Sequence, residues 1–475
     1  MLACVILSDA TCTALRPRPE PMPLCRPWRM LHRDVSGTSP PDTLPPATES
    51  TMIQQQYDHL RTDLPIRPRL HIHPAHGWLN DPNGLCRIDG RYHVFYQHNP
   101  DGPHHTNIHW AHVSSPDLIH WSDEPIALTP VVGSLNAQGC WSGCVVDDGG
   151  VPTAVYTAVL DAPHNAVVAV ARTDRTLRSW VLDPVGKIGK PDDPGVTEVR
   201  DPFLFTLDGR RYAVQGAGDP FGVPQLLLYS CDDLDTWEQL GPLLTLDDPI
   251  AAELAQANIW ECPNLFRLGD RWVIILSLWR HSDADQPLCG VRYLVGDLIP
   301  SGDGMRFIAQ GGGIVDDGDT FYAPQVLVDA NRVLLWGWAW EGADRSVVEI
   351  EAGGWAGTLT FPRELGLSGD LLVSRPAAEL VGLRTEQLDP GADGVVEASA
   401  FDVVAEGAVE LALVDPELGT REVVAKTTGA AQLLVDGSIV EVFGSGASAT
   451  SRHYPKTTSH WQIRSAAPYR VWALG

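Results

Sequence analysis

Short apolar runs alternate with polar turns along most of the chain, and the pattern recurs at a spacing of about 60 residues. Each copy has a short strand-like segment, a turn and then a second apolar run, such as YHVFYQ, RRYAVQ or RWVIIL. This order is typical of a β-hairpin. Five copies are present, and they open at Asp81, Trp141, Asp201, Glu261 and Tyr322.

Five repeats of an all-β unit predict a five-bladed β-propeller over residues 66–365. The first strand of each blade should line the central channel, so the polar residues that open the repeats are expected to meet at one end of it. A second echo, L-x-x-W, supports the period and places its tryptophans in the blade core. It occurs at Leu118/Trp121, Leu177/Trp180 and Leu234/Trp237.

The pattern changes at both ends of this region. Residues 366–475 contain short strands of alternating polarity and predict a second all-β domain, a β-sandwich, with GDLLVSRPAAEL (369–380) as the linker into it. Residues 1–65 are rich in Pro, Arg, Ser and Thr and predict a disordered extension. Met52 is a candidate for the true start of translation.

Composition narrows the classes of partner. The 475-residue chain carries a formal net charge of -26, which disfavours nucleic acid and anionic membrane surfaces and suits a neutral small molecule. Nine scattered cysteines without CxxC pairs, and the lack of a convincing signal peptide or membrane span, predict a cytoplasmic protein. The sequence leaves open whether the protein is a monomer or a homodimer.

The candidate chemistry rests on acids in register with the repeat. Three of the five repeats open with an acid followed closely by proline: Asp81, Asp201 and Glu261. Taken singly, these residues suit a turn, a surface salt bridge and a solvated strand end. Their shared register predicts a common site instead. Two adjacent carboxyl groups are what hydrolysis of a glycosidic bond needs.

These motifs resemble a known family. WLNDPNG (78–84), Arg200-Asp201-Pro202 and Glu261-Cys262-Pro263 are similar to the three acidic motifs of glycoside hydrolase family 32, the invertases and β-fructofuranosidases. The resemblance runs from about His71 to Gly475, and includes FYQHNP, HWAHVSSPDLIHW, FYAPQ and WAGTLTFPREL.

The resemblance implies a retaining hydrolase of sucrose or related fructosides. In it, Asp81 attacks the anomeric C2 of fructose, Glu261 is the acid/base, and Asp201 holds fructose hydroxyls. No metal or organic cofactor is expected, and the implied partner is a small sugar. The implied substrate-binding residues, by hydrogen bonds or as aromatic walls, are Trp78, Asn80, Gln97, Trp110, Trp141, Ser142 and Arg200.

Some features depart from the family or suggest other chemistry. Many members have a tryptophan where this chain has His105, and Ala111 replaces a glycine, so the leaving-group side of the pocket is expected to differ. His104, His105, His109 and His112 suggest zinc, but their spacing is irregular. Cys262 is interpreted as packing beside the glutamate.

Four alternatives remain open at this point. The first is a hydrolase of sucrose or sucrose 6-phosphate. The second is a fructan or fructo-oligosaccharide hydrolase, or a fructosyltransferase with the same covalent intermediate. The third is an inverting pentosidase with carboxyl groups about 6.5–9.5 Å apart. The fourth is a non-catalytic carbohydrate-binding propeller, since fold alone does not decide function.

Overall fold

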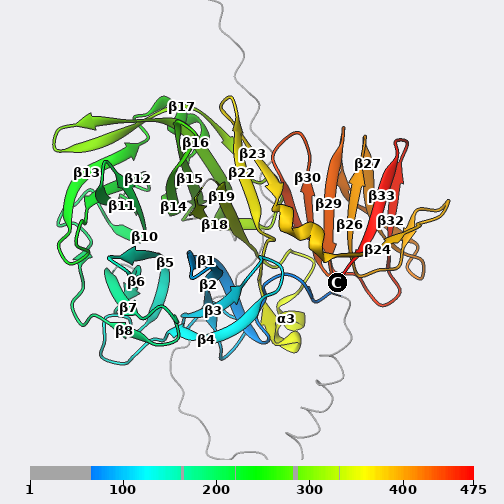
Figure 1. The fold of residues 1–475 in the computed structure, drawn as a ribbon, viewed down its shortest axis with the longest axis horizontal. Coiled ribbons are helices and arrows are strands. Elements are labelled where there is room, and N and C mark those ends of the chain that lie inside the picture. Colours follow the sequence, from blue (N-terminus) through cyan, green and yellow to red (C-terminus); the bar gives the residue numbers. More distant parts are fainter. Residues whose placement is uncertain (1–65, 162–164, 220, 282–286, 331) are drawn as a thin grey trace, which may run out of the picture.

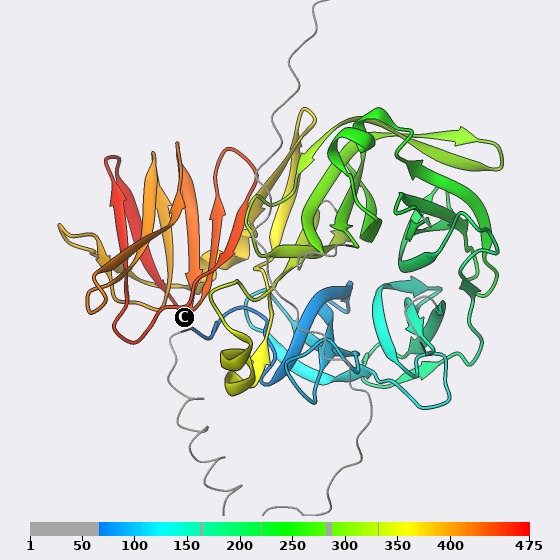
Figure 2. The ribbon, with the colours of Figure 1, turned by 180° about the vertical axis from the view of Figure 1, so that it is seen from behind.

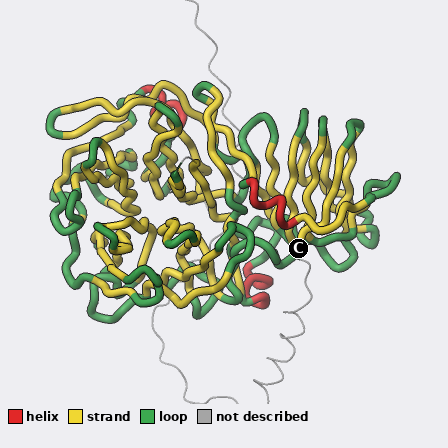
Figure 3. Tube along the Cα trace, in the orientation of Figure 1, coloured by secondary structure: helices red, strands yellow, loops and turns green. Residues whose placement is uncertain are grey.

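The structure is a computed structural model that describes residues 66–161, 165–219, 221–281, 287–330 and 332–475. The predictions for residues 1–65, including Met52 as the start, lie outside the described residues. The described chain is all-β, as expected, with a few short helices (Figure 3). None of the helices in these ranges is long and apolar enough to cross a membrane.

Five sheets follow one another along the chain and are arranged around a common centre (Figure 1). The first has the order β20-β1-β2-β3-β4, and the second β5-β6-β7-β8 with β9 on β7. Their bounds are β1 Gly77–Ile88, β2 Arg91–Asn99, β3 His109–Ser115, β4 Ser122–Leu128, β5 Gly139–Asp148, β6 Val151–Val159, β7 Ala166–Thr173, β8 Trp180–Leu182, β9 Ile188–Gly189 and β20 Trp355–Ala356.

The third and fourth sheets are antiparallel in sequence order, and the fifth has the order β18-β19-β22-β23 with β21 on β19. The bounds are β10 Glu198–Leu207, β11 Arg210–Gly218, β12 Pro224–Ser230, β13 Glu238–Thr245, β14 Ile259–Leu268, β15 Arg271–Trp279, β16 Leu288–Ser301, β17 Gly304–Ile314, β18 Phe321–Asp329, β19 Arg332–Ala339, β21 Thr358–Leu359, β22 Arg363–Ser368 and β23 Leu371–Pro376. The short helices α2 (Pro249–Leu254) and α3 (Val347–Gly353) lie in connections between strands.

The innermost strands of the five sheets contact one another in a cycle. β1 contacts β5, β5 contacts β10, β10 contacts β14, β14 contacts β18, and β18 contacts β1 again. The last connection is reinforced by β20, which follows β19 in the chain and pairs in parallel with the start of β1. Residues that begin the five repeats are thereby brought around one centre.

Local sequence explains why the first and third sheets start with a hairpin. The β1–β2 and β10–β11 turns are Asp89-Gly90 and Asp208-Gly209, and all four residues have φ between 49° and 81°. Two consecutive residues with positive φ make the turn that matches the twist of paired strands, and Asp-Gly is favoured there.

The L-x-x-W echo forms the same local structure three times. In each copy the indole Nε1 of the tryptophan donates a hydrogen bond to the carbonyl oxygen of the leucine three residues earlier, at 3.0–3.1 Å. The three leucines are buried with φ between 57° and 69°. The tryptophans pack against hydrophobic core, as the sequence predicts; the pairs are Leu118/Trp121, Leu177/Trp180 and Leu234/Trp237.

Two further sheets form the rest of the chain (Figure 2, orange to red). They share one hydrophobic core, in which Phe401 of one sheet meets Trp461 of the other with ring centroids 6.1 Å apart. Their orders are β24-β33-β26-β29-β30-β31 and β25-β32-β27-β28. The bounds are β24 Arg384–Leu388, β25 Val395–Val396, β26 Ala400–Ala405, β27 Val409–Asp415, β28 Thr420–Lys426, β29 Ala431–Asp436, β30 Ile439–Phe443, β31 Ala449–Arg452, β32 His460–Ser465 and β33 Tyr469–Leu474.

The predicted linker at 369–380 is wrong. Leu371–Pro376 is β23, which pairs along its whole length with β22 and completes the fifth sheet. The 3-10 helix η1 (Ala378–Leu383) then leads into β24. This segment resembled a linker for two reasons. A polar turn precedes β23, and an edge strand needs only one apolar face, so β23 itself carries polar residues.

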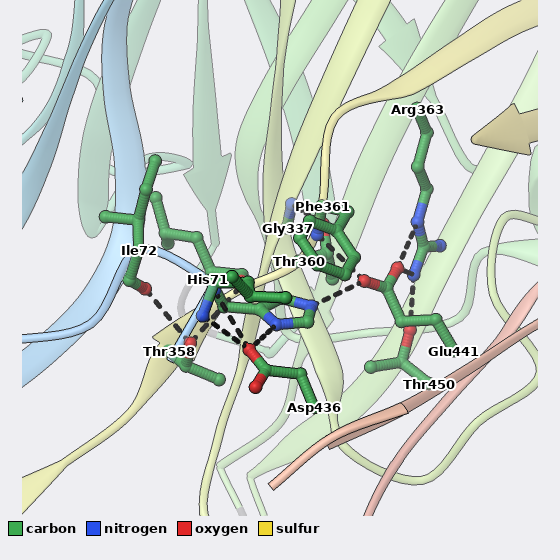
Figure 4. A network of polar contacts seen from close by, with 12 residues as sticks. His71, Ile72, Gly337, Thr358, Thr360, Phe361, Arg363, Asp436, Glu441 and Thr450 are labelled. Atoms are coloured by element: carbon green, nitrogen blue, oxygen red, sulfur yellow. Dashed lines mark hydrogen bonds and ion pairs between the residues drawn. The ribbon is translucent and has the colours of Figure 1, made fainter. Parts of the chain in front are cut away.

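A buried polar network joins the first described residues to the fifth sheet and to the six-stranded sheet of the last two (Figure 4). His71 contacts Asp436 through Nδ1 at 2.8 Å and Glu441 through Nε2 at 3.0 Å. Arg363 pairs with Glu441 and, at 2.6 Å, with Asp316. All five side chains are fully buried, so each charge depends on its partners.

This network makes stability depend on pH. Burial opposes protonation of His71, but Asp436 and Glu441 outweigh it and raise the pKa of His71 above its usual 6.5. Burial likewise opposes ionisation of the two carboxyl groups, but His71, with Arg363 in the case of Glu441, holds the pKa of each below its usual range. The histidine's contribution is therefore complete below about pH 6.5 and is lost as pH rises through its raised pKa. The carboxylates' contribution is lost only in acid.

We expect His71→Ala to lower the free energy of unfolding by about 3–5 kcal/mol at pH 6, because two buried carboxylates lose a cation. The deficit relative to wild type should shrink toward pH 9, as pH rises through the raised pKa of His71. Urea titrations at the two pH values measure it, with the exposed His120→Ala as control. A deficit independent of pH would mean that His71 acts only as a neutral hydrogen-bonding group.

Candidate active site

A β-bulge interrupts each of the five innermost strands at the same point. A bulge leaves residues out of the ladder, bends the strand and turns a side chain in a new direction. Proline follows at four of the five positions, where its missing N–H removes no ladder bond. The register breaks lie between Asn80 and Pro82, Cys140 and Gly143, Arg200 and Phe203, Glu261 and Asn264, and Tyr322 and Gln325.

The bulges hold side-chain-bearing residues in a strained backbone conformation. Asp201, Cys262 and Ala323 have φ of 60°, 44° and 44°. The left-handed region costs a non-glycine residue about 1–2 kcal/mol. Such strain persists where the surrounding structure fixes it, and it is common at functional sites.

Four polar contacts between neighbouring sheets each join residues 61 positions apart, so the repeat period appears directly in the geometry of the site. The acids of different repeats therefore meet at one end of the ring of strands. The contacts are Ser142 Oγ to Asp81 Oδ2 at 2.7 Å, Cys262 N to Asp201 Oδ2 at 2.9 Å, Arg200 Nε to Glu261 Oε1 at 3.1 Å, and Tyr322 Oη to Glu261 Oε2 at 2.8 Å.

Asp81 is surrounded by hydrogen-bond donors. Asn80 Nδ2 donates to Oδ1 at 2.9 Å, while Gln97 Nε2 and Ser142 Oγ donate to Oδ2 at 3.1 and 2.7 Å. The Sγ of Cys262 lies 3.5 Å from the same oxygen. These donors fix the orientation of the carboxylate. Because Asp81 is half-buried, it remains open to a ligand.

Glu261 lies between a cation, a hydroxyl group and the two other acids of the site. Burial raises the pKa of Glu261 to about 7, the carboxylates of Asp201 and Asp81 add to this shift, and Arg200 opposes it. The hydroxyl of Tyr322 donates to its Oε2. A carboxyl group with such a pKa can both donate and accept a proton near neutral pH.

Asp201 is the most enclosed of the three acids. Burial raises the pKa of Asp201 to about 6; the backbone N–H of Cys262 and the guanidinium of Arg200 oppose the shift, and Asp81 adds to it. Asp201 and Glu261 are therefore both acids whose pKa is raised by burial.

Aromatic rings form a wall beside Asp81. Trp78 donates from Nε1 to Asn80 Oδ1 at 2.7 Å. This bond holds the Asn80 amide, which in turn donates to Asp81. The imidazole of His105 lies between Trp78 and Trp141, with ring centroids 6.2 and 5.9 Å away. Its Nε2 is 3.3 Å from Gln97 Oε1, which orients the Gln97 amide toward Asp81.

The structure contradicts the placement of Trp110 in the wall. Trp110 has no exposed surface and packs in the core against Phe95 and Tyr156. Its Nε1 donates to the carbonyl oxygen of Trp141 at 3.0 Å, so it supports a wall residue from behind. The physical reason is its position on β3, a middle strand whose residues are all buried.

Two polar residues of the site were not singled out from the sequence. Tyr322 opens the fifth repeat, and the shared register was the signal that could have identified it. Glu198 contacts Arg200 at 2.6 Å but precedes the motif, so nothing in the sequence marks it. Arg200 and Ser142 lie beside the acids as the sequence predicts.

The histidine-rich segment forms pairs with non-metal partners. His104 pairs with Glu351 at 2.7 Å, and His93 Nδ1 lies 3.0 Å from His112 Nε2. Across the described ranges, no group of three or more His, Cys, Asp or Glu side chains could hold a metal ion.

Three carboxyl groups meet in a polar site beside tryptophan rings, an arrangement that suits a glycosidase. Residues 71–376 match the Glycosyl hydrolases family 32 N-terminal domain. The chain belongs to glycoside hydrolase family 32 and is a β-fructofuranosidase by class.

Relatives and solved structures agree with this assignment. The chain is 36% identical over 340 residues to sucrose-6-phosphate hydrolase of Escherichia coli, covering 69% of this chain and 68% of that protein. It is 32% identical over 333 residues to raffinose invertase of the same species, covering 67% and 66%. A GH32 β-fructofuranosidase of Bombyx mori superposes with a TM-score of 0.71 at 25% identity, covering 90% and 98%.

Proposed function

We propose that the protein is a retaining hydrolase that releases terminal β-D-fructofuranosyl units from sucrose or related fructosides through a covalent fructosyl-enzyme. Asp81 attacks the anomeric C2 of fructose. Glu261 protonates the departing oxygen and then deprotonates the water that hydrolyses the intermediate. No metal or organic cofactor takes part in this scheme.

The observation that carries the proposal is the contrast between two carboxyl groups in one site. Asp81 accepts three hydrogen bonds from side chains, whereas the pKa of Glu261 is raised to about 7 by burial and by its acidic neighbours. A carboxylate held in place by donors suits a nucleophile, and a carboxyl group with a raised pKa suits a general acid.

The remaining site residues have roles in binding the sugar. Asp201 and Arg200 suit the fructose hydroxyls and the charge that develops at the anomeric centre. Asn80, Gln97 and Ser142 hold Asp81 and offer further hydrogen bonds to fructose. Trp78, Trp141 and His105 would face the sugar, and the polar ring of His105 is where a different leaving-group preference is expected.

We also propose a five-bladed propeller over residues 66–376 followed by a β-sandwich over 377–475. The cycle of contacts among β1, β5, β10, β14 and β18 supports the propeller. The shared core of the last two sheets supports the sandwich. Cytoplasmic location and a monomeric or homodimeric state stay predictions from the sequence.

Two substrate classes compete within this proposal. Sucrose-6-phosphate hydrolases and a fructan 1-exohydrolase of Triticum aestivum, 33% identical over 347 residues, are both relatives. Transfer to a sugar acceptor uses the same intermediate. The test is fructose release from sucrose, sucrose 6-phosphate, 1-kestose, inulin and levan by one protein preparation. Release from any of them supports the proposal and ranks the substrates. No release from folded protein would favour a binding role.

A further inference from the structure

Glu198 and Arg200 lie two residues apart on β10, so their side chains leave the same face of the sheet. The guanidinium group of Arg200 donates hydrogen bonds to two acids. Its Nη1 donates to Glu198 Oε2 at 2.6 Å, and its Nε donates to Glu261 Oε1 at 3.1 Å. The arginine is buried, and each of the two glutamates has 18% of its side chain exposed.

Close backbone packing sets this arrangement. Arg200 pairs with Gly216 on β11. A Cβ atom at Gly216 would overlap the carbonyl oxygen of Trp260, the residue before Glu261. The glycine therefore lets β14 approach β11, which brings Glu261 within reach of Arg200.

Glu198 is itself held from the other side. The Nε2 of His281 lies 3.0 Å from Glu198 Oε1, and the backbone N–H of His281 donates to Asn258 Oδ1 at 2.6 Å. The ring of Trp279 packs against His281 and Arg200. Its centroid is 4.4 Å from that of the His281 ring and 5.7 Å from Arg200 Cζ. Glu198 thus has a fixed position between His281 and Arg200.

We propose that Glu198 is a positioning residue that shares Arg200 with Glu261 and so limits how tightly the arginine holds the acid/base. This inference rests on the proposed function. One guanidinium faces three carboxyl groups, those of Glu198, Asp201 and Glu261. Without Glu198 the fork of Arg200 is free to bind Glu261 through two nitrogens, the strongest geometry for such a pair.

The direction of the effect follows from charge. Glu198→Gln removes a negative charge near Glu261 and releases Arg200 toward it. Both changes favour ionised Glu261 and lower its pKa. Because the first step needs protonated Glu261, activity on the basic side of the profile should be lost at lower pH.

The test is the pH dependence of kcat/KM on the best fructoside for wild type, Glu198→Gln and Glu238→Gln. Glu238 is an exposed carboxylate at the start of β13 in the same sheet. We expect the basic limb of Glu198→Gln to move down by about half a pH unit or more, and that of Glu238→Gln to stay. With an aryl fructoside, whose leaving group needs no proton, the shift should disappear.

A limb that coincides with wild type overturns the inference, as does a uniform loss of activity at every pH. If Glu198→Gln does not fold, Glu198→Asp, whose shorter side chain withdraws from Arg200, should shift the limb in the same direction, and an unchanged limb is the contrary result. Active Asp81→Asn and Glu261→Gln variants would instead refute the proposed function, so the two failures are distinguishable.

Discussion

Asp81→Asn should lose hydrolysis of every fructoside, with kcat at least about 10⁴-fold below wild type, because an amide cannot attack the anomeric carbon. The variant should fold. Asparagine is close in shape to aspartate, and its oxygen still accepts the hydrogen bond from Asn80. On the other side its NH₂ group faces the donors Gln97 and Ser142, so a small loss of thermal stability is expected.

The matched control is Asp208→Asn. Asp208 lies in the β10–β11 turn with φ of 50°, a conformation that asparagine tolerates well. Fructose release and the melting temperature should be close to wild type. If Asp81→Asn turns over a fructoside at a rate comparable with this control, Asp81 is not the nucleophile.

Glu261→Gln should reduce kcat/KM on sucrose by about 10²–10⁴-fold, the usual contribution of a positioned general acid. The glutamine oxygen can still accept from Arg200, and its NH₂ group can donate to the hydroxyl oxygen of Tyr322, so the site should keep its geometry. The basic limb that reflects a pKa of about 7 should vanish from the profile, since the titrating group is gone. A fructoside with a good leaving group should recover much of the first step.

Pre-steady-state kinetics on both kinds of fructoside measure this prediction. Glu253→Gln, an exposed carboxyl group on α2, serves as the control. An equal loss on sucrose and on the activated fructoside would point to general damage of the site. If the basic limb persists in Glu261→Gln, the group that titrates there is another ionisable group of the site.

The repeat period was the most informative signal in the sequence. It predicted five sheets and the meeting of Asp81, Asp201 and Glu261, and the contacts between sheets do span 61 residues. The L-x-x-W echo likewise forms one recurring local structure. Both succeed because a repeated unit must bury the same face each time.

Other parts of the site were not accessible to such reasoning. Whether Trp110 faces a ligand or the core depends on which strands cover β3, and a motif does not state this. Glu198 acquires its role only because Gly216 lets β14 approach, so that Arg200 reaches two acids. The sheets that the edge strands β20 and β23 join could not be read from the sequence, because the neighbouring strand decides the pairing.

The central claim is that Asp81 becomes covalently bound to fructose. Mixing Glu261→Gln with an activated aryl fructoside, quenching in acid and determining the mass of the peptide that contains Asp81 tests it most directly. We predict that this peptide gains the mass of one fructosyl unit, and that the same peptide from the double variant with Asp81→Asn does not. Turnover of the aryl fructoside with the peptide unmodified throughout, and with the first fructose product inverted at C2, would contradict the account.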